Sequence, residues 1–331
     1  MEKKEFLDIS GTDVVEEAIW NYDAPLLRRL LEDKTTKRNI LWATKDYEYR
    51  GNEYGEKCEI LPELITGENT LLIQPRSAKA KDEQIARTRE KAEVFTPSWV
   101  CNCQNNLVDT EWFKRKNVFN IEIDEGWETT EEPISFKDVG KDWRQYVDTQ
   151  RLEITCGEAP YLVSRYDTVT GDPIPIRDRI GLLDRKLRIV NENTTTYEEW
   201  MKWSIRALQS VYGFEYQGDN VLLARENLLL TYIDYYRERN QENPKIEQIR
   251  AVANIIAWNI WQMDGMKYVV PGSCHNATAE QFDLLGNTIE TEPCPGCKYD
   301  KPFSHNGIYC MIQDWRSKTP VRFVDMMKGW E

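Results

Sequence analysis

The sequence predicts an α/β protein built around a parallel sheet. Two apolar, strand-like segments, Leu152 to Thr155 and Val211 to Phe214, are separated by helix-like sequence, and the first ends in a turn at Gly157. Strands that alternate with helices favour a parallel sheet, because each crossover helix returns the chain to the same end of the sheet. A long apolar stretch from Ala251 to Met263 follows. Its pattern fits either a buried helix that runs into a strand or a helix alone.

The N-terminal part has the pattern of an accessory α/β region. Apolar residues at helical spacing predict a helix from Val14 to Leu31, while Asn39 to Trp42 and Thr70 to Ile73 are strand-like. A polar segment from Ser77 to Lys91 precedes a helix-like run from Trp99 to Phe113. The predicted domains are therefore an accessory region at 1–90, a central α/β domain at 91–269 and a cysteine-rich tail at 270–331.

Composition predicts a soluble, cytoplasmic protein. Of the 331 residues 40% are hydrophobic, enough for a sizeable core. No apolar run approaches the roughly 20 residues that cross a bilayer, so no membrane partner is expected. The first residues, Met1 to Glu5, lack the apolar centre of a signal peptide.

The charge balance limits how the protein can meet nucleic acid. There are 43 basic and 56 acidic residues, which give a net charge of −13. This charge argues against a protein that binds the phosphate backbone of nucleic acid over a large part of its surface. Contact with DNA would need a local basic patch, and the best candidate is one short basic segment. Its members are Arg177, Arg179, Arg185, Lys186 and Arg188. The alternative, an ordinary solvated helix face, stays open.

The turn after the first strand is the most informative segment. Glu153 lies near the strand end, and Gly157 would let the backbone approach a ligand closely. In doubly wound sheets, ligands bind beyond the carboxyl ends of the strands. Taken alone, the segment also fits an ordinary strand-to-helix turn.

This segment resembles the first cofactor motif of gamma-like N6-adenine-specific DNA methyltransferases, in which a strand runs into Ala-Cys-Gly-Ser-Gly-x-Phe-Leu. Cys156, Gly157, Tyr161 and Leu162 fit that motif. The resemblance implies a class I S-adenosylmethionine-dependent methyltransferase-like (Rossmann-like) fold. It also implies that the protein serves as the modification subunit of a restriction-modification system.

Three further segments are similar to motifs of the same family and follow in its order. Tyr212 to Leu230 looks like the second motif, in which Glu215 would bind the ribose hydroxyls of S-adenosylmethionine. Asn259 to Met266 looks like the third, in which Asp264 would accept a hydrogen bond from the cofactor adenine. The upstream motif, which would pack over the methionine end of the cofactor, is matched by Phe95, Thr96 and Pro97.

The chain departs from the family at two places. Glu158, Ala159 and Pro160 replace the usual residues of the loop that would wrap the methionine moiety. The acceptor motif Asn/Asp-Pro-Pro-Tyr/Phe, which holds the flipped adenine, occurs nowhere in the sequence. Three interpretations follow: a methyltransferase with a diverged acceptor motif, part of an enzyme completed by another subunit, or a degenerate fold that binds DNA or a protein partner.

The tail contains a second kind of site. Cys294 and Cys297 are separated by two residues, a spacing that turns both sulfurs toward one tetrahedral ion. Cys274 and Cys310 are the natural second pair, with His305 or His275 as substitutes. The sequence thus predicts a structural zinc in a ribbon-like tail, against the alternative of two unrelated pairs of reduced thiols.

Overall fold

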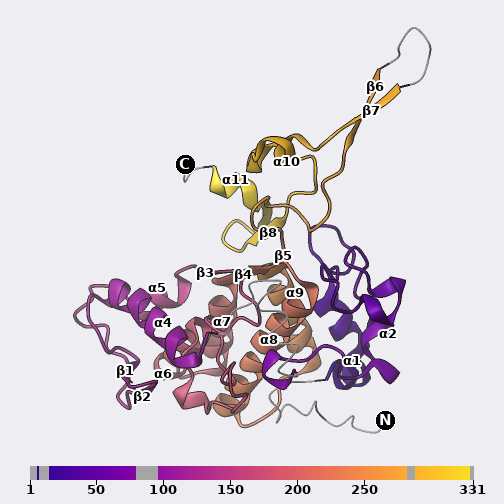
Figure 1. Ribbon diagram of the computed structural model, residues 1–331. Coiled ribbons are helices and arrows are strands. Elements are labelled where there is room, and N and C mark those ends of the chain that lie inside the picture. Colours follow the sequence, from indigo (N-terminus) through magenta and orange to yellow (C-terminus); the bar gives the residue numbers. More distant parts are fainter. Residues whose placement is uncertain (1–5, 7–14, 80–95, 282–287, 329–331) are drawn as a thin grey trace.

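The structure is a computed structural model that describes residues 6, 15–79, 96–281 and 288–328. It is a mixed α/β protein whose central sheet has three parallel strands in the order β3-β4-β5 (Figure 1). These strands are β3 (Arg151–Ile154), β4 (Val211–Glu215) and β5 (Ile260–Gln262). The two strands expected at positions 152 and 211 are confirmed. The stretch from Ala251 is a helix that ends at Asn259 and runs directly into β5.

Helices make up most of the rest of the described chain. Those before the tail are α1 (Glu16–Leu31), α2 (Pro62–Ile65), α4 (Ser98–Phe113), α5 (Trp143–Asp148), α6 (Leu182–Asn193), α7 (Tyr197–Gln209), α8 (Gly218–Asn240) and α9 (Ile246–Asn259). A small antiparallel pair, β1 (Asn120–Ile123) and β2 (Gly126–Thr129), follows α4. The tail contains β6 (Ala277–Gln281), β7 (Thr288–Glu292), α10 (Pro295–Tyr299), β8 (Met311–Asp314), β9 (Thr319–Arg322) and α11 (Phe323–Met327). No helix in the described ranges has both the length and the apolar character needed to cross a membrane.

The two faces of the central sheet are covered by different parts of the chain. Val211 and Ile260 point into a large core shared with the helices, including the almost wholly buried α8. Tyr212 and Trp261 point the other way, into a smaller core with tail residues such as Phe323. Side chains alternate along a strand, so the two cores lie on opposite faces. The tail therefore lies across one face of the sheet while the helices fill the other, as Figure 1 shows.

The N-terminal region belongs to the same core as the central domain. The boundary predicted at residue 90 falls in 80–95, outside the described residues, and buried side chains on both sides of it share the large core. Asp23, at a kink in α1, forms an ion pair with Arg250 of α9 at 2.6 Å. The strands expected in this region are absent from the described residues: Asn39 and Leu41 make only isolated bridges, and 70–73 is a turn.

Gly218 permits a close backbone contact between the N-terminal region and α8. Its N–H donates to Trp42 O at 3.0 Å, and a Cβ at this position would lie 2.0 Å from Leu41 O. We therefore expect Gly218→Ala to lower the free energy of unfolding by about 1–3 kcal/mol, the usual cost of overpacking. Urea denaturation measures the change. Gly126→Ala is the matched control, because its Cβ would meet Ile123 at an ordinary 3.4 Å; equal midpoints for the two variants would show that the contact relaxes freely.

Candidate functional site

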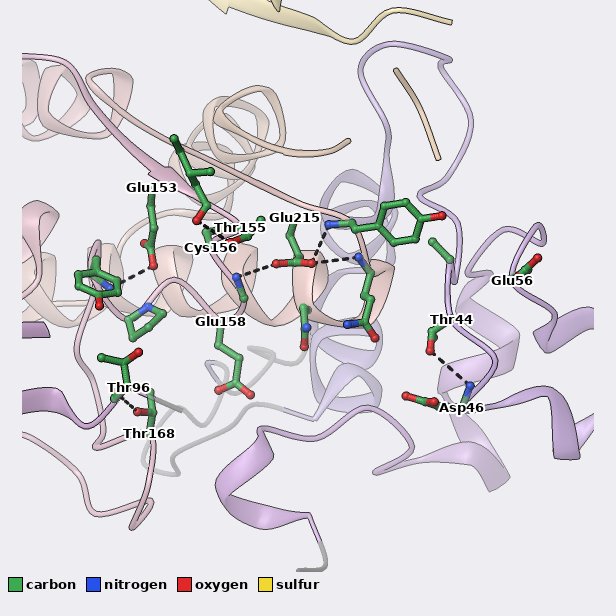
Figure 2. Close-up of a pocket in the computed structure, with 18 of the residues that line it drawn as sticks. Thr44, Asp46, Glu56, Thr96, Glu153, Thr155, Cys156, Glu158, Thr168 and Glu215 are labelled. Atoms are coloured by element: carbon green, nitrogen blue, oxygen red, sulfur yellow. Dashed lines mark hydrogen bonds between the residues drawn. The ribbon is translucent and has the colours of Figure 1, made fainter. Parts of the chain in front are cut away.

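A cavity of about 870 Å³ opens at the carboxyl ends of β3 and β4 (Figure 2). This volume lies within the range of about 300–1,000 Å³ that small-molecule and cofactor sites occupy. Its lining residues come from the two strand ends, from the segment after β3, from the N-terminus of α8, from the N-terminal region and from the residues just before α4. They are Ala43, Thr44, Lys45, Asp46, Glu56, Thr96, Glu153, Ile154, Thr155, Cys156, Gly157, Glu158, Pro160, Tyr161, Thr168, Glu215, Tyr216, Gln217 and Asn220.

Most of the predicted cofactor residues line this cavity. Those that do are Thr96, Glu153, Cys156, Gly157, Tyr161 and Glu215. Phe95 lies outside the described residues, and Pro97 precedes the first residue of α4 without lining the cavity. Asp264 is also not part of the lining. Its carboxylate accepts from Met266 N at 3.1 Å and pairs with Lys267 at 3.0 Å, so it closes its own turn.

Glu215 is held at the centre of the cavity by backbone amides. Oε2 accepts from Gly157 N at 3.0 Å, and Oε1 accepts from Tyr216 N at 2.7 Å and from Gln217 N at 3.3 Å. Burial raises the pKa of Glu215, while these three N–H donors act to lower it. A carboxylate offers about four acceptor positions. Glu215 therefore keeps capacity for a further donor from a ligand.

Glu153 is the second buried carboxylate of the cavity. Its Oε1 accepts from Tyr161 N at 3.4 Å, whereas its buried Oε2 has no hydrogen-bond partner among the described residues. Burial raises the pKa of Glu153 well above its ordinary value, and the nearby Glu215 carboxylate raises it further. A buried polar atom without a partner is unusual in a folded protein. Such an oxygen is suited to a cationic or hydrogen-bond-donating ligand.

Left-handed backbone conformations gather around the same cavity. Ala43, Thr155 and Gly157 line it with φ values of 49°, 52° and 51°, and Ala159 in the same loop has a φ of 64°. Three of these residues carry a Cβ, which makes the left-handed region unfavourable. Strain of this kind persists where the surrounding structure holds it and is concentrated at functional sites.

The lining is strongly acidic. Five of its side chains are carboxylates, namely Asp46, Glu56, Glu153, Glu158 and Glu215, against one lysine, Lys45. A cavity with this excess of negative charge attracts cations and repels phosphate groups. The site therefore suits a positively charged ligand better than a nucleotide that carries phosphates.

Glu158, which departs from the family's first motif, has a structural role. Its Oε1 accepts from Arg76 N at 2.7 Å, and its Oε2 accepts from Tyr166 OH at 2.6 Å. Asn227 of α8 donates to Glu158 O at 3.1 Å and to Tyr166 OH at 3.0 Å. These contacts fix the loop after β3 against α8 and the N-terminal region, so Glu158 makes the wall of the cavity more rigid.

The predicted DNA-facing segment is wrong for its two central residues. Arg185 has 1% and Lys186 0% of its side chain exposed. Arg185 pairs with the buried Asp109, and Lys186 Nζ donates to Ser210 Oγ, so both side chains have their partners inside the fold and neither can face DNA. Burial also lowers the pKa of Lys186 well below its ordinary value.

The outer arginines of that segment are also mostly committed to acidic partners. Arg179 is buried and pairs with Asp234 at 2.7 Å, and Arg188 pairs with Glu192 at 2.7 Å. Arg177 is exposed. No continuous basic face follows from these residues.

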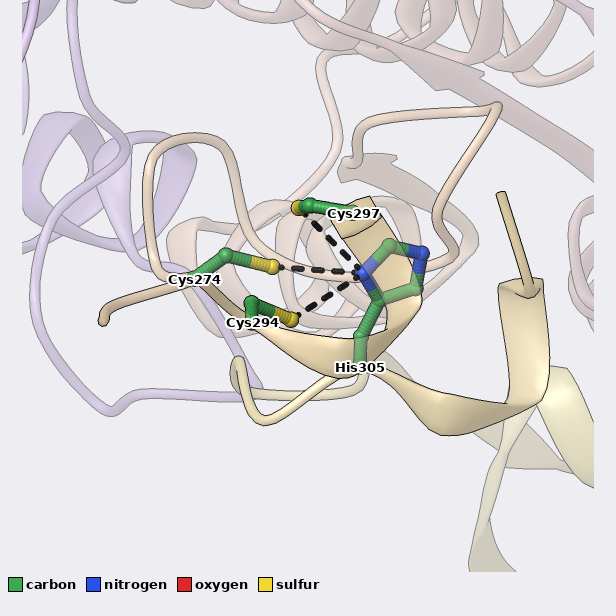
Figure 3. A group of neighbouring side chains, drawn as sticks. All are labelled: Cys274, Cys294, Cys297 and His305. Carbon is green, nitrogen blue, oxygen red and sulfur yellow. Dashed lines mark hydrogen bonds between the residues drawn. The ribbon is translucent and has the colours of Figure 1, made fainter. Parts of the chain in front are cut away.

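A candidate metal centre lies in the tail, where Cys274, Cys294, Cys297 and His305 converge (Figure 3). The three sulfurs lie 3.5, 3.6 and 3.7 Å from Nδ1 of His305. A ring nitrogen has one proton or one lone pair, so it cannot form three hydrogen bonds. Tetrahedral zinc, with Zn–S near 2.3 Å and Zn–N near 2.0 Å, places sulfur about 3.5 Å from nitrogen. The cluster therefore has the geometry of a metal site.

The fourth position of this cluster belongs to His305 and not to Cys310. Cys310 is buried in the smaller core, and its Sγ donates to Gln262 O at 3.3 Å. His305 was a predicted substitute, and the structure brings it to the three other cysteines. At Cys294, burial raises the thiol pKa, but hydrogen bonds from the N–H groups of Asn306 and Cys297, together with those of His305 and Cys274, lower the pKa to about 6. This favours the thiolate that a metal binds.

Sequence reasoning missed the N-terminal contribution to the cavity. Residues 43–46 and Glu56 line it, although they precede β3 by about 100 residues and match no motif. They are recognised only from contacts between segments that are distant in the sequence.

Comparisons of this chain with protein-family models, with curated proteins and with solved structures found no match.

Proposed function

We propose that the protein binds S-adenosylmethionine in this cavity, as the cofactor-binding part of a DNA adenine-N6 methyltransferase or of a subunit of one in a restriction-modification system. The observation that carries the proposal is the pair Glu153 and Glu215, which face one cavity from the ends of adjacent parallel strands. In the doubly wound order 3-2-1-4-5-6, the first three strands lie side by side in chain order. The sheet β3-β4-β5 has this arrangement.

The donor set of the cavity fits this cofactor. Glu215 has acceptor capacity for one ribose hydroxyl, and Gly157 leaves its backbone close to the ligand because it carries no Cβ. The unpartnered Oε2 of Glu153 suits the ammonium of the methionine end. When bound, S-adenosylmethionine supplies a methyl group on a positively charged sulfur. An acidic cavity accommodates that charge, whereas it disfavours the phosphates of ATP or NAD.

A panel of ligands tests this assignment. S-adenosylmethionine at 100 times its Kd should stabilise the protein by about 2.7 kcal/mol, because it binds only the folded state. We expect a rise in Tm with S-adenosylmethionine and none with ATP or NAD at the same concentration. A rise with the phosphate-bearing ligands alone would contradict the proposal.

Cofactor binding should depend on pH through Glu153. Its pKa is raised in the free protein, and a cationic ligand favours the ionised carboxylate. Affinity should therefore increase as pH rises through the pKa of Glu153, and binding below that pKa should release a proton. Calorimetry in two buffers of different ionisation enthalpy measures the release, which Glu153→Gln should abolish. Proton uptake on binding would contradict this role.

Methyl transfer to DNA by this chain alone is less well supported, because the sequence lacks the Asn/Asp-Pro-Pro-Tyr/Phe motif. A second observation favours completion by another subunit. β3 is an edge strand of the described sheet, and Leu152 and Ile154 on it are 43% and 67% exposed. Exposed edge strands commonly accept a further strand. The competing function is a binding module for DNA or a protein partner that has lost catalysis.

Transfer of labelled methyl groups separates these functions. If the chain is a complete enzyme, it should label DNA that contains adenine without any added protein. If it needs a completing subunit, labelling should appear only in the presence of that subunit. Binding of S-adenosylmethionine without labelling under either condition would leave the binding module as the function.

We also propose that the metal of the tail is zinc. Three thiolates and one imidazole form a soft, closed set of four ligands, which is typical of structural zinc sites. The ligands come from both ends of the segment 274–305, so a bound ion would join the loop before β6 to the segment around α10. Elemental analysis of the purified protein should show about one zinc per chain.

A further inference from the structure

The segment 41–46 of the N-terminal region is a fixed wall of the cavity. The side chain of Gln262, at the end of β5, forms two hydrogen bonds with the backbone of Leu41. Its Oε1 accepts from Leu41 N, and its Nε2 donates to Leu41 O, both at 2.8 Å. The same Nε2 donates to Tyr216 O at 2.8 Å. One amide therefore joins this segment to β5 and to the residue that follows Glu215.

Two further contacts hold the segment in place. Trp42 O accepts from Gly218 N at 3.0 Å, and Ala43 N donates to Glu56 O at 2.9 Å. Trp42 packs between Tyr47 and Tyr54, with ring centroids 4.6 and 5.5 Å away. The left-handed conformation of Ala43 is maintained by these contacts, and it turns the chain toward the cavity.

The position of this wall relative to the two buried carboxylates gives it a role. In Figure 2, Thr44, Asp46 and Glu56 lie on the opposite side of Glu215 from Glu153. On the proposed function, Glu153 meets the methionine end of the cofactor and Glu215 meets its ribose. The adenine then extends to the side where Thr44 and Asp46 line the cavity, whereas Asp264 does not line it.

We infer that the carboxylate of Asp46 recognises the adenine of the cofactor by accepting a hydrogen bond from its exocyclic amine. The sequence resemblance assigns this role to Asp264. A carboxylate accepts hydrogen bonds from the exocyclic amine of adenine and repels the carbonyl oxygen that hypoxanthine carries at the same position. Asp46 N donates to Thr44 Oγ1 at 3.3 Å, which fixes the turn that presents the carboxylate. This inference rests on the proposed function and assigns a role to the N-terminal region.

The test compares S-adenosylhomocysteine with S-inosylhomocysteine, in which the exocyclic amine is replaced by a carbonyl and the adjacent N1 gains a proton, by calorimetry on the full-length protein. One hydrogen bond to a charged group corresponds to a preference of about tenfold to a hundredfold for the adenine ligand. In Asp46→Asn the preference should fall to within about threefold, because an amide can accept from the amine or donate to the carbonyl. Asp264→Asn is the matched control and should keep the wild-type preference.

The outcomes separate this inference from the proposed function. If the wild type binds neither S-adenosylmethionine nor these two ligands, the proposed function itself fails. If the wild type binds both homocysteine ligands equally, the cavity does not read the exocyclic group and the inference alone is overturned. A preference that Asp46→Asn retains and Asp264→Asn loses would return the role to Asp264.

Discussion

Replacing His305 with alanine should release the bound metal and unfold much of the tail. The imidazole would supply one of the four ligands, because the three sulfurs lie 3.5, 3.6 and 3.7 Å from its Nδ1, as around a tetrahedral ion. Structural zinc sites contribute about 10–16 kcal/mol of apparent binding free energy in small zinc domains, so the loss of one ligand has a large effect. We expect metal content near zero by elemental analysis and rapid proteolysis within 270–328.

Cys310→Ser is the control that separates the two possible ligand sets. Cys310 is buried in the smaller core, and serine keeps a donor for Gln262 O. The variant should therefore retain its metal, with at most a modest loss of stability. Loss of metal from Cys310→Ser together with full retention in His305→Ala would show that the ligand set is the four cysteines and not the cluster around His305.

Glu215→Gln is expected to lower the affinity for S-adenosylmethionine by about tenfold to a hundredfold, since one hydrogen bond to a charged group is worth about 1.5–3 kcal/mol. Alanine is not a suitable replacement at this position. Glu215 accepts from three backbone N–H groups, and alanine would leave all three without this partner. Glutamine keeps one acceptor oxygen, so the variant should fold with only a small decrease in Tm.

Glu56→Gln is the charge-matched control for this substitution. Glu56 lines the same cavity but is exposed, so removing its charge should change the affinity less than about threefold. Calorimetric titration of both variants with S-adenosylmethionine measures the two affinities. Equal losses in the two would mean that Glu215 acts only through the overall charge of the cavity.

The parts of the fold that local pattern determines were predictable. β3, β4 and α4 follow from strand and helix periodicity, and the strand-end position of Glu153 and Glu215 follows from the motifs. Because adjacent parallel strands end at one edge, that position is enough to bring both carboxylates to one cavity.

The errors arise where contacts between distant segments decide the structure. Arg185 and Lys186 look like a basic face in sequence, but α6 is covered by other helices, and Asp109 of α4 neutralises the guanidinium. Among the cysteines, spacing identifies the pair at 294 and 297 but cannot choose between Cys310 and His305. Cys310 is not available as a ligand because its side chain is packed in the smaller core against the sheet. The wall at 41–46 depends on Gln262, more than 200 residues away, and no local signal marks it.

Calorimetric titration of the metal-loaded, full-length protein with S-adenosylmethionine near neutral pH directly tests the proposed cofactor site. We predict one site per chain with a micromolar Kd, and a clearly weaker affinity in Glu215→Gln but not in Glu56→Gln. An absence of binding at millimolar S-adenosylmethionine, in protein shown to be folded and to contain its metal, would contradict this prediction.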